Sequence, residues 1–135
     1  MKSFLVIGMG RFGTAVAQEL TELGQEVLAI DENVESVQRI ADDVTQVMQG
    51  DAQDEAVAGG HRRAQLRLLY CCGRYGIWRA SILITVMLKE LGAQYIIAKA
   101  RSTVHAKVLE RVGADRVVLP ESEMGCKLAQ RPGTY

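Results

Sequence analysis

The sequence has few of the residues that stabilise secreted proteins or anchor proteins in membranes. It contains three cysteines, and two of them, Cys71 and Cys72, are adjacent. They form no C-x-x-C motif, so neither a disulfide framework nor a cysteine-ligated metal site is expected. No apolar run reaches the roughly 18 residues of a membrane span. Met1 and Lys2 lead into a strand-like run and not into a signal peptide. We therefore expect a cytoplasmic protein without direct membrane insertion.

The sequence also lacks an excess of either charge. Its 16 Lys and Arg residues are balanced by 16 Asp and Glu residues, and they form no basic cluster. This distribution argues against nucleic acid or an anionic membrane as a partner. Hydrophobic residues make up 48% of the chain and charged residues 24%, which is typical of a globular domain. The length allows one domain with a sizeable core.

A glycine motif follows the first strand-like run, residues 4–7. Gly8, Gly10 and Gly13 have the spacing G-x-G-x-x-G, and from Thr14 apolar residues return at helical steps. The first glycine permits a tight turn, the second lets a phosphate approach the backbone, and the third lets the helix pack closely on the strand. The helix N-terminus then offers N–H groups and a partial positive charge to an anion.

A second apolar run, residues 27–30, ends in Asp31. This acid lies about 20 residues beyond the glycines, as the dinucleotide-binding fingerprint requires. A carboxylate there can accept hydrogen bonds from both ribose hydroxyls. The alternative is a βαβ unit with a solvent-facing Asp31. With the glycines in the right context, the sequence predicts a nucleotide site.

The rest of the chain alternates between strand and helix patterns. Asn33 is a candidate N-cap for a helix ending near residue 41. Asp51 follows the third predicted strand, either beside the nucleotide crevice or as a turn residue capping the next helix. The remaining predictions are strands over 44–48, 95–98 and 116–119, helices over 80–92 and 104–113, and a helix starting near 124. Alternation predicts an α/β fold, a Rossmann-like doubly wound parallel sheet of about six strands in a single domain, with order 3-2-1-4-5-6.

Several motifs in residues 3–55 and 79–130 resemble the N-terminal RCK domain (regulator of potassium conductance, TrkA-N type) of Trk/Ktr potassium-uptake regulators, closest to the KtrA-like branch. They include Val6-Ile-Gly-Met-Gly-Arg-Phe-Gly13, Asp31-Glu-Asn33, Gly50-Asp-Ala52, His105-Ala-Lys-Val-Leu-Glu110, Gly113-Ala-Asp-Arg-Val117 and Pro120-Glu121. The resemblance implies a regulatory subunit, not an enzyme. Such a subunit is peripheral to the inner face of the cell membrane, where homodimers assemble into a ring on a membrane potassium translocation subunit. It binds ATP/ADP or NAD(H), with Mg²⁺ or another cation beside the nucleotide.

The resemblance also assigns roles to individual residues. The implied phosphate turn is Gly8, Met9, Gly10, Arg11, Phe12 and Gly13; the ribose side is Asp31, Glu32 and Asn33; the adenine side is Asp51 and Ala52; and the far phosphate side is Lys99, Ala100, Arg101 and His105. Glu121 is expected to face the phosphates through a bound cation. Simpler alternatives are a solvated Arg11, a surface Lys99, a surface His105 and a helix-capping Glu121.

Residues 57–78 depart from the family pattern and show no clear period, although 66–72 could form a strand. Our hypothesis is a local frameshift, which would disturb the fourth strand and the loop after it. The chain also lacks the family's C-terminal subdomain, so residues 1–135 are expected to form an N-terminal nucleotide-binding domain alone. Two other functions stay open. One is a fragment of an NAD-dependent oxidoreductase, since the glycine motif and Asp31 suit NAD equally well. The other is a folded remnant without a ligand.

Overall fold

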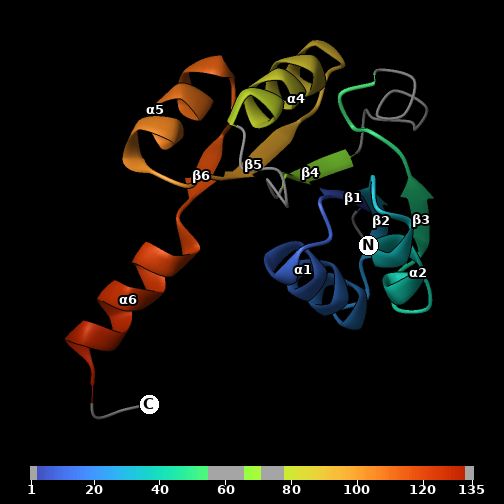
Figure 1. Cartoon of the computed structure of the whole chain (residues 1–135), viewed down its shortest axis with the longest axis horizontal. Coiled ribbons are helices and arrows are strands. Elements are labelled where there is room, and N and C mark those ends of the chain that lie inside the picture. The colour runs from blue at the N-terminus through green and yellow to red at the C-terminus, as the bar shows by residue number, and fades with distance from the viewer. Residues whose placement is uncertain (1–2, 55–65, 71–77, 133–135) are drawn as a thin grey trace.

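The computed structural model describes residues 3–54, 66–70 and 78–132. Its described part is built on a six-stranded sheet in the order β3-β2-β1-β4-β5-β6 (Figure 1). All neighbouring strands are parallel. The strands are β1 (Ser3–Ile7), β2 (Glu26–Asp31), β3 (Gln46–Gln49), β4 (Leu66–Tyr70), β5 (Tyr95–Lys99) and β6 (Arg116–Val118). The predicted α/β class, strand number and strand order are confirmed.

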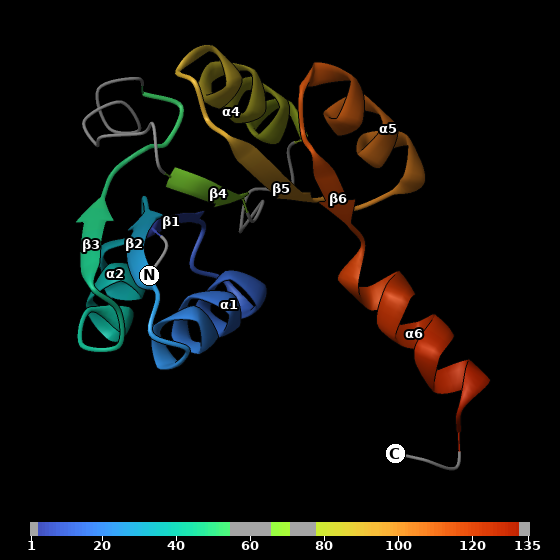
Figure 2. The same cartoon turned by 180° about the vertical axis from the view of Figure 1, so that it is seen from behind.

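The helices cover both faces of the sheet (Figures 1 and 2). They are α1 (Arg11–Glu22), α2 (Val34–Ile40), α4 (Trp78–Glu90), α5 (Thr103–Val112) and α6 (Pro120–Gln130). Leu5 and Ile7 of β1 pack in one core with residues of α4 and α5, whereas Val6 packs in a second core with Ala17 of α1 and Ile40 of α2. Strands buried on both faces are near-continuous apolar runs, which is why residues 4–7 and 27–30 show no polar alternation.

Several element boundaries differ from the prediction, including those of α4, which spans Trp78–Glu90 and not 80–92. Helix α1 begins at Arg11, so the motif's second half is already helical. Strand β3 begins at Gln46. Before it, Val44 is buried in the second core, and Thr45 accepts a hydrogen bond from the backbone N–H of Val27. The last helix begins at Pro120 and not near Met124, because proline suits the first helical position and Glu121 complements the positive helix end.

Only part of the segment that departs from the family pattern is described. Residues 66–70 form β4, which pairs with β1 from Leu66 to Tyr70 and with β5 from Arg67 to Tyr70. The possible strand over 66–72 is therefore confirmed for these residues. Residues 55–65 and 71–77 lie outside the described part, and the frameshift hypothesis stays a prediction.

Helix α6 differs from the other helices because it extends away from the sheet in both views (Figures 1 and 2). None of its residues is buried, and Met124 and Leu128 are exposed large hydrophobic side chains. In the described part of the chain, no helix has both the length and the apolar character needed to cross a membrane.

Candidate nucleotide-binding site

The turn between β1 and α1 has the geometry that its glycines predict. Gly8 has a φ of +93°, a left-handed conformation that favours glycine, and its N–H donates to the carbonyl of Ile30 at 2.8 Å. Gly13 is buried together with Ala17 one turn later. Two small residues on the buried side let α1 pack closely against the sheet and aim its N-terminus at the carboxyl ends of β1 and β2.

The N-terminus of α1 is open to an anion. Gly10 is the N-cap residue, no side chain caps the helix, and its first turn holds no acidic residue. By contrast, Asn33 caps α2, whose first turn holds Glu35, and Ser102 caps α5. A Cβ added to Gly10 would meet no atom of the described residues within 4 Å, so these residues leave the space above it open. The donors and partial positive charge of α1 therefore face open space.

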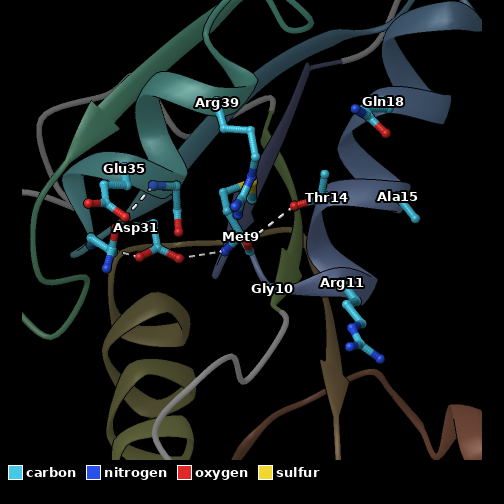
Figure 3. A pocket seen from close by; sticks show the side chains of 11 residues that line it. Met9, Gly10, Arg11, Thr14, Ala15, Gln18, Asp31, Glu35 and Arg39 are labelled. Carbon is cyan, nitrogen blue, oxygen red and sulfur yellow. Dashed lines mark hydrogen bonds between the residues drawn. The ribbon is translucent and has the colours of Figure 1, made fainter.

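Asp31 ties the glycine turn to the end of β2 (Figure 3). Its Oδ2 accepts the Met9 N–H at 2.6 Å, and its Oδ1 accepts the Asn33 N–H at 2.8 Å. The side chain of Met9 is buried, so this residue reaches the site through its backbone. The simple solvent-facing alternative for Asp31 is wrong. Each carboxylate oxygen keeps a lone pair, so ribose hydroxyls can still donate to it.

A cavity of about 600 Å³ lies between α1, α2 and the glycine turn. It is lined by Met9, Gly10, Arg11, Thr14, Ala15, Gln18, Asp31, Asn33, Glu35, Ser36 and Arg39. The volume falls within the range of small-molecule sites. Figure 3 shows Arg39 reaching from α2 toward the glycine turn, whereas Arg11 points away from Asp31.

Sequence reasoning missed six lining residues, namely Thr14, Ala15, Gln18, Glu35, Ser36 and Arg39. A signal was present in α2. Glu35 and Arg39 are four residues apart and Ser36 and Arg39 three apart, which places them on one side of the helix. In α1, Thr14 donates to the carbonyl of Met9 at 3.1 Å and so braces the turn.

The predicted adenine side begins next to Asp31. The Gly50 N–H donates to the Asp31 carbonyl at 2.9 Å, which brings the end of β3 beside the end of β2. Asp51 Oδ1 accepts the Gln53 N–H at 2.8 Å, so Asp51 stabilises a turn while it stands at the crevice. Ala52 is buried, and Glu32 is exposed.

Three residues predicted for the phosphate side, Phe12, Lys99 and Glu121, meet at the carboxyl end of β5, but none of them is among the residues that line the cavity. Lys99 Nζ lies 3.7 Å from Glu121 Oε1 and 5.7 Å from the centre of the Phe12 ring. The Lys99 side chain is 23% exposed and that of Glu121 is 81% exposed. Lys99 is thus held beside Phe12 and Glu121 and does not extend freely into solvent. Among the described residues, no group of three His, Cys, Asp or Glu side chains could hold a metal ion, so a cation at Glu121 would depend on oxygens of the nucleotide.

His105 is fully buried, at 0% exposure, so its interpretation as a surface residue is wrong. Its Nδ1 accepts the Arg101 N–H at 3.1 Å, and its Nε2 lies 2.7 Å from Ser81 Oγ. Because Nδ1 accepts, the proton of the neutral ring belongs on Nε2, which donates to Ser81. Burial, and secondarily the charge of Arg101, lowers the pKa of His105. Arg101 is exposed, whereas Ala100 is buried and donates its N–H to the Val118 carbonyl.

Solved structures share this fold. The NAD(P)-binding domain of an exopolyphosphatase-related protein from Archaeoglobus fulgidus superposes with a TM-score of 0.84 at 21% identity, covering 100% of both chains. GsuK with bound ADP superposes with a TM-score of 0.80 at 20% identity, covering 98% of this chain and 35% of that one.

Sequence comparison identifies the family. Ktr system potassium uptake protein A from Bacillus subtilis is 40% identical over 131 residues, which are 96% of this chain. This chain spans 58% of the length of that relative. The profile of the TrkA-N domain matches residues 4–120, which include the glycine turn, Asp31 and the end of β5. The chain belongs to the TrkA-N domain family.

Proposed function

We propose that this chain is the nucleotide-sensing domain of a cytoplasmic regulatory subunit that controls a membrane potassium translocation subunit. The observation that carries the proposal is the open, uncapped N-terminus of α1, which lies directly beside the anchored carboxylate of Asp31. A 40% identical relative is named a potassium uptake protein, and GsuK, which shares the fold, has been solved with ADP. Both support the proposal.

In the proposed binding mode, the phosphates lie over Gly10 and the N–H groups that begin α1, and the ribose hydroxyls donate to Asp31. The adenine extends toward Asp51 and Ala52. Lys99 and Arg101 supply positive charge at the far side of the phosphates. A cation between the phosphates and Glu121 would remove the repulsion between these two anionic groups.

Binding, and not catalysis, suits the residues that line the cavity. Among the described residues that line it there is no His, Cys, Lys or Tyr that could transfer a proton or act as a nucleophile. Asp31 already accepts two backbone hydrogen bonds, so its carboxylate is committed to holding the turn and a ribose. His105, the one histidine in the described part of the chain, is buried between α4 and α5. These features argue against the oxidoreductase alternative.

Regulation would follow from a difference in affinity. A nucleotide that binds one arrangement of a homodimer, or of a ring of dimers, better than another shifts the population toward that arrangement. The membrane subunit would respond to this shift, which places the chain at the inner face of the membrane through its partner.

Thermal unfolding with ATP, ADP, NADH and NADPH tests the proposal. A ligand that binds only the folded state raises the free energy of unfolding by about 2.7 kcal/mol at a concentration of 100 times its Kd. We expect a concentration-dependent rise with an adenine nucleotide and a smaller rise with inorganic triphosphate at the same concentration, because triphosphate lacks the ribose that Asp31 would hold. No rise with any nucleotide would contradict the proposed site.

The regulatory role needs a separate measurement. We expect the chain to co-purify with a potassium translocation subunit of its own genome and ATP or ADP to change the amount retained. If nucleotide binds to the chain but the translocation subunit is never retained, the site would stand and the proposed partner would be wrong.

A further inference from the structure

Helices α4 and α5 enclose three polar side chains that the proposed binding mode does not use. Ser81, Thr85 and His105 are each 0% exposed. A buried polar group is costly unless it is hydrogen-bonded, so such a cluster needs specific partners. An apolar interface would stabilise the helix pair more simply. We therefore asked which part of the backbone these buried hydrogen bonds hold in place.

His105 connects three elements. The backbone N–H of His105 donates to Ser102 Oγ at 3.1 Å, while its ring Nδ1 accepts the backbone N–H of Arg101 at 3.1 Å. These reciprocal bonds resemble a capping box, with an imidazole in place of the usual Glu. The opposite nitrogen, Nε2, lies 2.7 Å from Ser81 Oγ in α4. The ring thus fixes the loop between β5 and α5 to the neighbouring helix.

In the proposed binding mode, that loop forms the far edge of the nucleotide site. Lys99, at the end of β5, contacts both Phe12 of the glycine turn and Glu121 of α6. Between Lys99 and Arg101, the Ala100 N–H donates to Val118 at 2.8 Å. The backbone of residues 99–101 is consequently held on one side by β6 and on the other by His105.

We propose that Ser81 and His105 are positioning residues of the nucleotide site, which hold the Arg101 backbone so that Lys99 and Arg101 face the phosphates. Neither side chain touches the nucleotide itself. Buried Ser81 cannot reach a ligand, and His105 Nδ1 already accepts the Arg101 N–H. The inference rests on the proposed function and replaces the direct ligand role predicted for His105.

A matched pair of α4 variants tests the proposal, because only one of two buried hydroxyls contacts His105. Ser81 bonds the imidazole, whereas Thr85 Oγ1 donates to the Ser81 carbonyl at 2.8 Å within its own helix. We measure the affinities of ATP and adenosine by calorimetry in full-length S81A and T85V. In S81A, the ratio of ATP to adenosine affinity should fall about three- to tenfold. In T85V, the ratio should stay that of wild type. An unchanged ratio in S81A, or an equal fall in T85V, would overturn the proposal.

Two variants of His105 separate the effect of its bond to the Arg101 N–H from that of its bond to Ser81. In H105N the amide oxygen can replace Nδ1 and accept from Arg101, whereas in H105Q the amide nitrogen can replace Nε2 and donate to Ser81. We expect H105Q to lose more of the ATP preference than H105N. The reverse order would contradict the proposal. If the wild-type chain binds neither ATP nor adenosine, the proposed function itself is wrong. This outcome differs from a wrong positioning role, in which the wild type binds ATP and the variants keep its preference.

NMR of the imidazole nitrogens in the wild-type chain tests the assignment without any variant, so the result does not depend on whether a variant folds. Neutral His105 should carry its proton on Nε2, with Nδ1 unprotonated, and ATP should shift the Arg101 amide more than the ring nitrogens. A proton on Nδ1, or a ring signal that responds to ATP as a direct ligand would, overturns the assignment.

Discussion

Gly8 and Gly10 differ in what a methyl group at each position would meet. Gly8 has a φ of +93°, where any L side chain is strained, so it is needed for folding. Gly10 has a φ of −75°, and its added Cβ would have no neighbour within 4 Å. Gly10 is the N-cap of α1, a position that favours glycine over alanine. The open space above it also suits the approach of a phosphate to the backbone, as we propose.

Replacing Gly10 with alanine should therefore separate binding from stability. We expect G10A to unfold near the wild-type temperature, because alanine restricts the unfolded chain by about 0.4–1 kcal/mol but is a poorer N-cap residue than glycine, and the two effects oppose each other. Nucleotide affinity should fall by at least about tenfold because the methyl group occupies the phosphate position. Gly125→Ala is the matched control, since its Cβ also meets nothing within 4 Å and it lies in α6. Equal nucleotide affinity in G10A and G125A would show that phosphates do not lie over the turn.

His105 should make stability depend on pH. Its folded-state pKa is lowered by burial and by Arg101, so below about pH 6.5 the unfolded chain takes up a proton that the folded chain refuses. Stability should therefore fall as pH drops through 6.5 toward the folded pKa, with a slope of at most about 1.4 kcal/mol per pH unit. Urea unfolding at pH 7.5 and 5.5 would measure this loss.

The comparison for this measurement is H105Q, which keeps His61 and every carboxylate. The variant should be less stable at pH 7.5 but lose less stability on acidification than wild type. If both proteins lose the same amount between the two pH values, His105 is not the group responsible.

At the scale of elements, α4 shows why the buried face of a largely apolar helix cannot be recognised from its sequence. Its sequence predicts a helix from Ile82, Leu83, Val86, Met87 and Leu91, and the helix is confirmed. Yet Leu83 is 50% exposed, whereas Ile84 and Leu88 are buried beside the hydroxyls of Ser81 and Thr85. Because apolar residues occur nearly all round α4, periodicity alone could not choose between its faces. Two hydroxyls four residues apart in such a helix were the available signal.

Two leucine truncations in α4 should have unequal costs. Leu88 is 1% exposed and belongs to the core beneath α4 and α5. Its replacement by alanine should lower the free energy of unfolding by about 2–5 kcal/mol. For half-exposed Leu83, the same replacement should change it by less than about 1 kcal/mol. Chemical denaturation of both variants checks this, and a comparable loss in L83A would mean that Leu83 is covered in solution.

Helix α6 should be the least stable described helix of the isolated chain. It has 11 residues, none of them buried, and isolated helices shorter than about 12–15 residues are marginal in water. We expect its amides to exchange with solvent nearly as fast as an unfolded chain, while those of α5 are protected. Hydrogen exchange followed by NMR would measure the difference. Protection of α6 that matched α5 in a dilute monomer would contradict this expectation.

For the whole molecule, the strand order could be predicted because the glycine motif and the alternation of strands and helices indicate a Rossmann-like sheet, whose order is known, although the sequence of β4 itself shows no clear period. Residues 4–7 and 27–30 are continuously apolar, since β1 and β2 are buried on both faces of the sheet. The glycine turn and Asp31 could likewise be placed from spacing alone. Their link could not, because the bond from the Met9 N–H to Asp31 joins residues 22 positions apart.

Other parts of the site depend on contacts that no local pattern encodes. Arg39 reaches the cavity only because α1 and α2 pack on the same face of the sheet. His105 lies in a helix that mixes apolar residues with Lys107 and Glu110, so a histidine at this position could equally have faced solvent. Its burial becomes apparent only when α4 supplies Ser81. Tertiary packing decides such positions, and sequence periodicity does not.

Helix α6 can also convert a small rotation at its first turn into a larger displacement of its far end. At 1.5 Å per residue its 11 residues span about 16 Å, and the ion pair between Glu121 and Lys99, which ties it to the sheet, lies in its first turn. Lys99 is therefore at the fulcrum, where phosphates would compete with Glu121 for its charge. A rotation of about 10° there would swing the far end by about 3 Å. A small change in the pairing of Lys99 would thus become a larger displacement at the far end of α6, because no residue of this helix is buried against the sheet.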